Sequence, residues 1–254
     1  MKNGQNKSRA KRITQEQTEQ VISLRGTMTA KEIATTVGVT YDQVNEVFKR
    51  YNMTNKHNIN FEINSLQNQI FLSGKLGDGN YKPNGKYNYY YRENHAEDEK
   101  EYLIWKMISL GNMINNQGLY KIKKGGWNTQ QPYGFSTKTS PSLIKYAEMS
   151  IQDAILQLDE KGLIMFMLDD GWFTKHSRQG NFCISGGVLT REDLDCLCIQ
   201  FSKYNINDVH IVGHKRLDVS IPSSNNKMLY DIATSFIPCD TDIIIKKFQY
   251  INTN

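Results

Sequence analysis

Phe71-Leu-Ser-Gly-Lys-Leu-Gly-Asp78-Gly79 and Leu163-Ile-Met-Phe-Met-Leu-Asp-Asp170-Gly171 are the two stretches that decide the fold, and their last acids stand ninety-two positions apart. Each stretch is mostly apolar and ends in an acid and a glycine. Glycine just after the last periodic residue is a helix stop signal. A carboxylate there interacts unfavourably with the helix dipole and costs about 0.3–1 kcal/mol unless a nearby cation neutralises it. Two such helices packed together would hold paired carboxylates, which indicates a divalent-metal site.

Several further segments stand in a fixed order around these two stretches. They are Asn94-His95, Glu101-Tyr-Leu-Ile-Trp105-Lys106, Leu158-Asp-Glu-Lys-Gly-Leu163, Phe236-Ile-Pro238 and Lys246-Lys247-Phe248. The ordered set covers roughly residues 69–248. It resembles the LAGLIDADG family of homing endonucleases, in the two-motif form that acts as a monomer.

The resemblance implies a metal-dependent DNA endonuclease that hydrolyses phosphodiester bonds in a long double-stranded target. Asp78 and Asp170 would be the catalytic acids and metal ligands, with Gly77 and Asp169 as further candidate ligands beside them. Asp169 is the weaker alternative, because Asp170 is the acid that precedes the glycine. Mg²⁺ is the expected cofactor and Mn²⁺ its possible substitute, since both accept carboxylate oxygens.

The family also places a basic residue near each metal site, late in each half. Lys247 is the best match in the second half and Lys246 is the next best. The first half departs from the pattern, and Lys145 is only a weak substitute there. This departure predicts unequal cutting of the two strands, with a nicking enzyme as the extreme case.

An internal duplication is visible without the family. A shift of ninety-two positions brings a predicted helix at residues 97–110 onto another at 189–201, and a predicted strand at 86–92 has its counterpart at 181–185. Each half reads as helix, hairpin, helix, hairpin, helix. We therefore expect an α+β fold with a pseudo-twofold αββαββα core, two DNA-binding antiparallel sheets, and halves at about 65–157 and 158–254.

The small residues of the first motif suggest how the two motif helices meet. Gly74 and Gly77 would let a partner helix approach closely, whereas Met165 and Asp169 stand in the second motif. The acid-rich start of the helix at 97–101 reads as a solvated face, and His95 as a residue that caps or packs.

Candidate DNA contacts come from polar positions on the predicted hairpins. A two-stranded ribbon fits the major groove, where alternating polar side chains reach base edges. The candidates are Lys82, Lys86, Asn88, Arg92, Lys121, Lys123, Lys138, Arg178, Gln179 and Asn181.

Residues 14–52 read as a small all-α domain in front of the core. Thr29 and Thr40 each open a capping box, and Ala34, Gly38 and Val44 have the spacing of a helix-turn-helix. Gln43 and Asn45 are candidate readers of adenine edges, and Lys49 and Arg50 of phosphates. A three-helix protein-interaction module is the alternative. Residues 53–64 are polar and aperiodic, which predicts a linker.

The net charge of +5 comes from the first twelve residues, since without them basic and acidic residues balance. Residues 1–13 therefore read as a disordered basic arm, which either keeps the chain in solution or follows phosphates. No apolar run reaches the length of a membrane span, and the four cysteines lack metal-binding spacing. We expect a cytoplasmic protein of a bacterium or an infected cell, with an organelle as the alternative.

Two other functions remain open at this stage. One is a non-catalytic transcriptional regulator that uses the same scaffold beside a helix-turn-helix. The other is an intron maturase, which would bind RNA. The retained acids argue against the first, and the helix-turn-helix argues for duplex DNA over RNA.

Overall fold

The computed structural model describes residues 13–51, 60–84, 88–123, 130–174, 180–187, 189–214 and 216–248. Residues 1–12 of the predicted arm, most of the predicted linker, and the candidate contacts Lys86, Arg178 and Gln179 lie outside these ranges. The chain divides into two compact units, Met1–Asn60 and Phe61–Asn254. None of the described helices is long and apolar enough to cross a bilayer.

The first unit holds three helices around its own apolar core. They are α1 (Gln15–Ser23), α2 (Ala30–Val37) and α3 (Tyr41–Arg50). Thr29 and Thr40 form the expected capping boxes, and Thr14 forms a third one at the start of α1. Gly38 ends α2 at φ +70°, a conformation that glycine adopts without strain. The helices and the turn between α2 and α3 therefore follow the sequence closely.

The second unit repeats one order of elements twice, which confirms the predicted fold class. The first half comprises α4 (Ser65–Leu76), β1 (Gly79–Pro83), β2 (Tyr89–His95), η1 (Glu97–Glu99), α5 (Lys100–Leu110), η2 (Gly111–Met113), β3 (Tyr120–Lys121), β4 (Tyr133–Ser136), η3 (Pro141–Leu143), α6 (Ile144–Glu148) and α7 (Ile151–Leu156). The second half comprises α8 (Glu160–Asp170), β5 (Gly171–Phe173), β6 (Phe182–Ser185), α9 (Arg191–Lys203), β7 (His210–Val212), β8 (Asp218–Ile221), η4 (Ser223–Asn225), α10 (Asn226–Thr234) and α11 (Asp242–Phe248). The helices α7 and α11 were not predicted.

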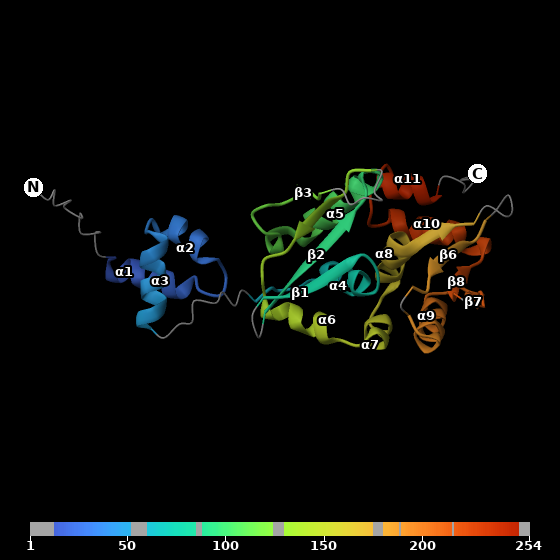
Figure 1. Ribbon diagram of the computed structural model, residues 1–254, viewed down its shortest axis with the longest axis horizontal. Helices are drawn as coiled ribbons and strands as arrows, with labels where there is room; N and C mark the ends of the chain where they lie inside the picture. Colours follow the sequence, from blue (N-terminus) through green and yellow to red (C-terminus); the bar gives the residue numbers. More distant parts are fainter. Residues whose placement is uncertain are drawn as a thin grey trace, which may run out of the picture. The chain divides into compact units, whose positions relative to one another are not determined.

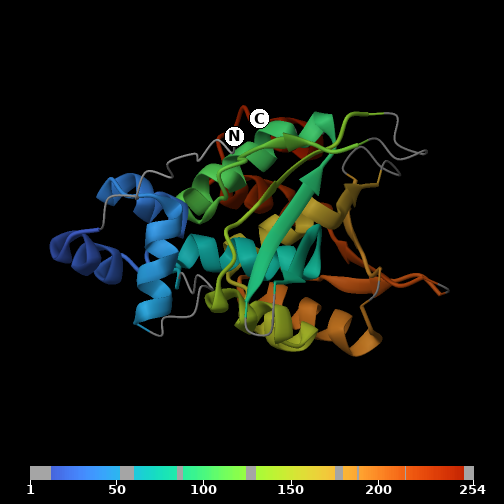
Figure 2. The ribbon, with the colours of Figure 1, turned by 60° about the vertical axis from the view of Figure 1, so that its left-hand side comes forward.

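Each half builds one antiparallel four-stranded sheet, and the two sheets share a strand order. The orders are β1-β2-β4-β3 and β5-β6-β8-β7. The helices α4 and α8 lie side by side where the halves meet (Figures 1 and 2). Both are largely buried, and their apolar residues belong to one continuous core that runs through both halves.

The strand β2 begins later than predicted and extends to His95. The predicted strand ended at Arg92, whereas β2 continues through Glu93, Asn94 and His95. In the structure Tyr91, Glu93 and His95 all point to the buried side. The alternation predicted for the strand is correct, but its buried face is partly ionic.

Close approach of α4 and α8 depends on Gly77 but not on Gly74, which corrects the prediction. A Cβ atom at Gly74 would lie 2.0 Å from the hydroxyl of Tyr91, so this glycine makes room for the sheet. A Cβ atom at Gly77 would lie 3.1 Å from Cβ of Asp169. On α8, Gly162 has the same function, because its Cβ would lie 2.1 Å from Oε1 of Gln69 on α4.

Candidate active site at the helix tips

The two motifs place their acids against each other across the α4–α8 contact. Asp78 follows Gly77 at the end of α4, and Asp170 is the last residue of α8. A Cβ atom at Gly77 would lie only 3.0 Å from Oδ2 of Asp170. Gly171 turns directly into β5, where a Cβ atom would meet the carbonyl oxygen of Met167 at 2.2 Å. The backbone contact requires glycine at Gly171, as the stop signal predicted, whereas at Gly77 the tight contact is with a carboxylate that could shift.

Both acids are in an environment that disfavours their charged form. Burial, with a smaller contribution from the carboxylate of Asp78, raises the pKa of Asp170 to about 6, while Lys247 acts in the opposite direction. Burial also raises the pKa of Asp78, although its side chain keeps 38% of its exposure. A pair of crowded carboxylates that retains access to solvent is suited to hold a cation.

A buried lysine, Lys106 of α5, lies directly behind these tips. Its Nζ atom is 2.8 Å from both carboxylate oxygens of Asp169 and 2.5 Å from Oε1 of Glu93. All three side chains are fully buried. Burial would lower the pKa of Lys106, but the two carboxylates outweigh it and raise that pKa. Asp169 is thus held in an ion pair inside the protein.

His95 connects this ion pair to the first motif. Its Nε2 atom is 2.8 Å from Oε1 of Glu93, and its Nδ1 atom is 3.0 Å from Oε2 of Glu99 and 3.7 Å from Oδ2 of Asp78. Burial would lower the pKa of His95, but hydrogen bonds to the two glutamates raise it to about 10. The raised pKa and the carboxylate facing each nitrogen favour the protonated ring.

Glu93 is the centre of the network, because it also accepts a hydrogen bond from the hydroxyl of Tyr91. Burial alone would raise its pKa, but Lys106 and His95 lower it to about 2. The charges behind the helix tips are therefore internally paired before any ligand is considered.

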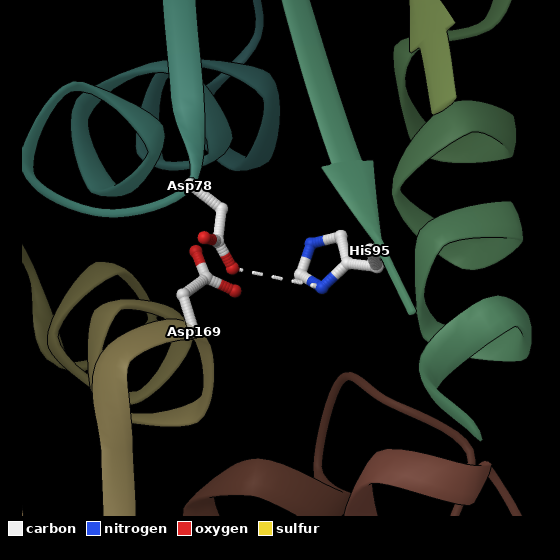
Figure 3. A group of neighbouring side chains, drawn as sticks. All are labelled: Asp78, His95 and Asp169. Atoms are coloured by element: carbon white, nitrogen blue, oxygen red, sulfur yellow. Dashed lines mark ion pairs between the residues drawn. The ribbon is translucent and has the colours of Figure 1, made fainter. Parts of the chain in front are cut away.

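Three side chains in the site are close enough to share one cation. Asp78, His95 and Asp169 each offer a ligand atom, and these atoms lie within 4.8 Å of one another (Figure 3). Two of the three are poor ligands, however. The raised pKa of His95 and its contacts with two glutamates disfavour the neutral ring that a metal ligand needs, and Asp169 is paired with Lys106. The donor set that fits a divalent cation is therefore Asp78 with Asp170. The side chain of Asp170 makes no hydrogen bond or ion pair within the described part of the chain.

The two lysines near the end of the chain point to different partners. Lys247 donates to the carbonyl oxygen of Gly171, and burial lowers its pKa. Lys246 makes ion pairs of 2.9 Å with both Asp98 and Glu99 of the first half. Lys247 is thus in contact with the second motif itself, while Lys246 pairs with acids of the first half. Lys145 lies elsewhere, with Nζ 4.6 Å from the ring of Tyr146.

The outer face of the first sheet carries some of the predicted DNA contacts. Lys82 is exposed on β1, and its neighbour in the register, Tyr90, lies on the same face of β2 as Arg92. The Arg92 guanidinium stands 5.8 Å from the ring of Tyr120, and its Nε atom donates to Asn94. Lys123 is exposed and Lys138 is half-buried, and both lie outside the strands.

Three other predicted contacts are not presented as expected. Asn88 is buried at 5% exposure, because β2 starts after it. Lys121 pairs with Tyr133 and so lies on the face opposite Arg92. Asn181 is half-buried, and its amide bonds Ser220 and the backbone of Ser223.

On α3 the candidate readers also differ in what they expose. The side-chain oxygen of Gln43 accepts from the backbone of Thr40, so the capping box uses its acceptor. Asn45 is half-buried, Lys49 is exposed, and Arg50 is exposed beside Glu46 at 3.5 Å. The two cationic candidates are therefore better presented than the two amides.

Comparison with solved structures identifies the architecture. The homing endonuclease I-WcaI, bound to its DNA recognition sequence, superposes with a TM-score of 0.61 and 16% identity, over 80% of this chain and 92% of that one. The chain has the LAGLIDADG fold. I-DmoI in complex with DNA and Mn matches with a TM-score of 0.40 and 12% identity, over 69% of this chain and 98% of that one. The LAGLIDADG domain of WhiA matches with a TM-score of 0.41 and 14% identity, over 68% and 84%.

No family model matches the chain, and neither does any curated protein. The likeness is thus one of three-dimensional structure.

Sequence reasoning about the LAGLIDADG core missed Glu93, Glu99 and Lys106 as members of the site. The solvated face predicted for the start of α5 is wrong for Glu99, which binds both His95 and Lys246. A signal was available for Lys106, because it follows the buried Tyr102 by four residues and so lies on the same helix face. Glu93 stands two positions after Tyr91 and so lies on the same buried strand face, which was the available signal for Glu93.

Proposed function

We propose that this chain is a site-specific homing endonuclease that cuts long double-stranded DNA targets with divalent metal at Asp78 and Asp170. The observation that supports this most directly is the pair of carboxylates at the touching tips of α4 and α8. Burial raises both pKa values, and the carboxylate of Asp78 adds to the rise at Asp170. Active sites are where such perturbed pairs gather.

The residues of this chain have separate tasks in the proposal. Asp78 and Asp170 hold Mg²⁺, with Mn²⁺ as a substitute, and the bound cation supplies charge stabilisation at the phosphate and a more acidic water. Lys247 brings a positive charge to the base of the second motif. Lys106 keeps Asp169 out of the ligand set.

The protein would act as a monomer, and DNA would bind along the outer faces of its two sheets. Lys82 and Arg92 provide cationic contacts on the first sheet, since phosphate neutralisation supplies most non-specific affinity. Lys49 and Arg50 of α3 would add contacts from the first unit, as part of a helix-turn-helix that extends target recognition.

A non-catalytic DNA-binding regulator is the second candidate, and one observation favours it. Lys106 and His95 already neutralise Asp169 and Glu93 without metal. A scaffold that had lost cleavage would keep such a network, because the network stabilises the fold. Asp78 and Asp170 would then have no task, which is why the nuclease is preferred. An intron maturase would need RNA binding in addition.

The test is cleavage of a plasmid that carries the uninterrupted form of the chain's own genomic locus. The wild type, Asp78→Asn and Asp170→Asn are compared in Mg²⁺, Mn²⁺ and Ca²⁺, with Asp240→Asn, an exposed acid, as the matched control. We expect the wild type and the control to cut and both motif variants to fail. Tight binding without cutting in any metal would favour the regulator. Resolving nicked from linear product tests the unequal cutting of strands.

A further inference from the structure

The last helix, α11, docks on the first half of the chain. It contacts α5 and η1 as well as α10, and Figure 1 shows it beside α5. Asp242, its first residue, accepts hydrogen bonds from the backbone N–H groups of Glu101 at 2.8 Å and Tyr102 at 3.2 Å. The residue before α5, Glu99, supplies no side-chain cap of its own. Asp242 thus caps α5 from 141 positions further along the chain.

Lys246 fastens the same helix through charge. Its ammonium lies 2.9 Å from Asp98 and 2.9 Å from Glu99. Glu99 in turn lies 3.0 Å from His95, the ring of which faces Asp78 at 3.7 Å. A continuous series of contacts therefore runs from α11 to the acid of the first motif.

Lys247 leaves the same helix towards the second motif. It donates to the carbonyl oxygen of Gly171, the residue that follows Asp170. Consecutive helix residues point about 100° apart, so two adjacent lysines reach the two motifs separately. One short helix is in contact with both halves of the site.

We propose that Asp242 and Lys246 are positioning residues that dock α11 on α5 and thereby set where Lys247 stands beside the second motif. The proposal rests on the proposed nuclease function. It assigns Lys246 to the first-half acids rather than to the phosphate. Loss of either contact leaves the buried Ile243, Ile244 and Phe248 in the core, so the variants should fold.

Docking can be measured without any cleavage, by hydrogen exchange at the N–H groups of Glu101 and Tyr102. We expect Asp242→Ala to raise exchange at both amides, because it removes their acceptor, and Asp242→Asn to retain part of the protection. Asp240→Ala is the matched control, since Asp240 is exposed two positions earlier. Unchanged exchange in Asp242→Ala would overturn the docking contact.

Positioning is measured by single-turnover cleavage and DNA affinity in parallel. Lys246→Met and Asp242→Ala should lower the cleavage rate, by as much as about a hundredfold if Lys247 shifts by an ångström, and leave the Kd for DNA nearly unchanged. Lys246→Arg should restore the rate. Lys227→Met, which removes an exposed lysine paired with an aspartate on α10, is the control and should cut like wild type.

The two assays separate the possible failures. Raised exchange with a normal cleavage rate would overturn the positioning role. A fall in DNA affinity equal to the fall in rate would also overturn it, because Lys246 would then act in binding. A wild type that never cuts would overturn the proposed function and the positioning role together, while the exchange result still decides whether α11 docks through Asp242.

Discussion

Replacing Lys106 by methionine should destabilise the second unit strongly. Lys106→Met keeps the length of the side chain but removes the only ammonium described within hydrogen-bond reach of Asp169. Removing one partner of a buried ion pair costs about 3–5 kcal/mol. Here Asp169 loses its cation and Glu93 loses one of its two cationic neighbours, so the upper end is expected. In a unit of this size about 1 kcal/mol moves Tm by about 2–4 °C, which gives a fall of about 10–20 °C.

Thermal unfolding followed by circular dichroism at neutral pH measures this fall. Lys227→Met, at a fully solvated lysine on α10, should move Tm by no more than about 1–2 °C. The variant Lys106→Met with Glu93→Gln and Asp169→Asn removes the stranded charges and should recover much of the loss. A Tm within about 2 °C of wild type for Lys106→Met alone would refute the reasoning, because the lysine would then not be neutralising buried charge.

The same variant has a pH signature with a definite sign. Without the ammonium, burial raises the pKa of both carboxylates above their unfolded values. Such groups contribute stability that is present below the unfolded pKa and is lost as the pH rises through the folded pKa. The Tm difference between wild type and Lys106→Met should therefore shrink as the pH is lowered towards about 5.

Three further outcomes follow from the site. The pKa of His95 is raised to about 10, so its contribution to stability is complete below about pH 6.5 and is lost as the pH rises through about 10. The free energy of unfolding of His95→Gln, measured by urea titration, should therefore change less with pH across that window than that of the wild type. Equal slopes would contradict the assigned charge. Asp78→Asn should lower the pKa of Asp170 from about 6, because the neighbouring carboxylate helps to raise it; carbon-13 carboxyl titration measures this, and an unchanged value would mean that the two acids do not interact. Gly77→Ala should cost about 1–3 kcal/mol and weaken Ca²⁺ binding measured by calorimetry, since its Cβ would lie 3.0 Å from Oδ2 of Asp170; wild-type affinity would show that the tips can separate freely.

Much of the fold could be predicted from local signals. The glycines that end α4 and α8 can be recognised in the sequence, and capping boxes show where helices begin. The alternation of tyrosines marked the buried face of β2. These signals depend on residues a few positions apart, so they can be read along one sequence.

The ionic network could not be predicted in the same way, because its members meet only in three dimensions. Lys106 lies 63 positions from Asp169, and Asp242 lies 141 positions from Glu101. Charged residues on a buried face contradict the apolar pattern used to find cores, so Glu93 and Lys106 were not predicted as members of the site. Helix α11 was not predicted because it is short and the contacts at its first residue are with the first half of the chain.

The buried ion pair between the two halves limits how this chain can be recombined with other proteins. Asp169 stands where the first motif has Gly77, and Lys106 stands where the second half has Cys198. One half thus contributes the cation and the other the anion of a single buried pair. A chimera that joins the first half to a foreign partner with a small residue before its acid inherits an unmatched ammonium, and a foreign first half leaves Asp169 unmatched. Designers who shuffle halves to change the target would need to transfer Lys106 and Asp169 as one unit.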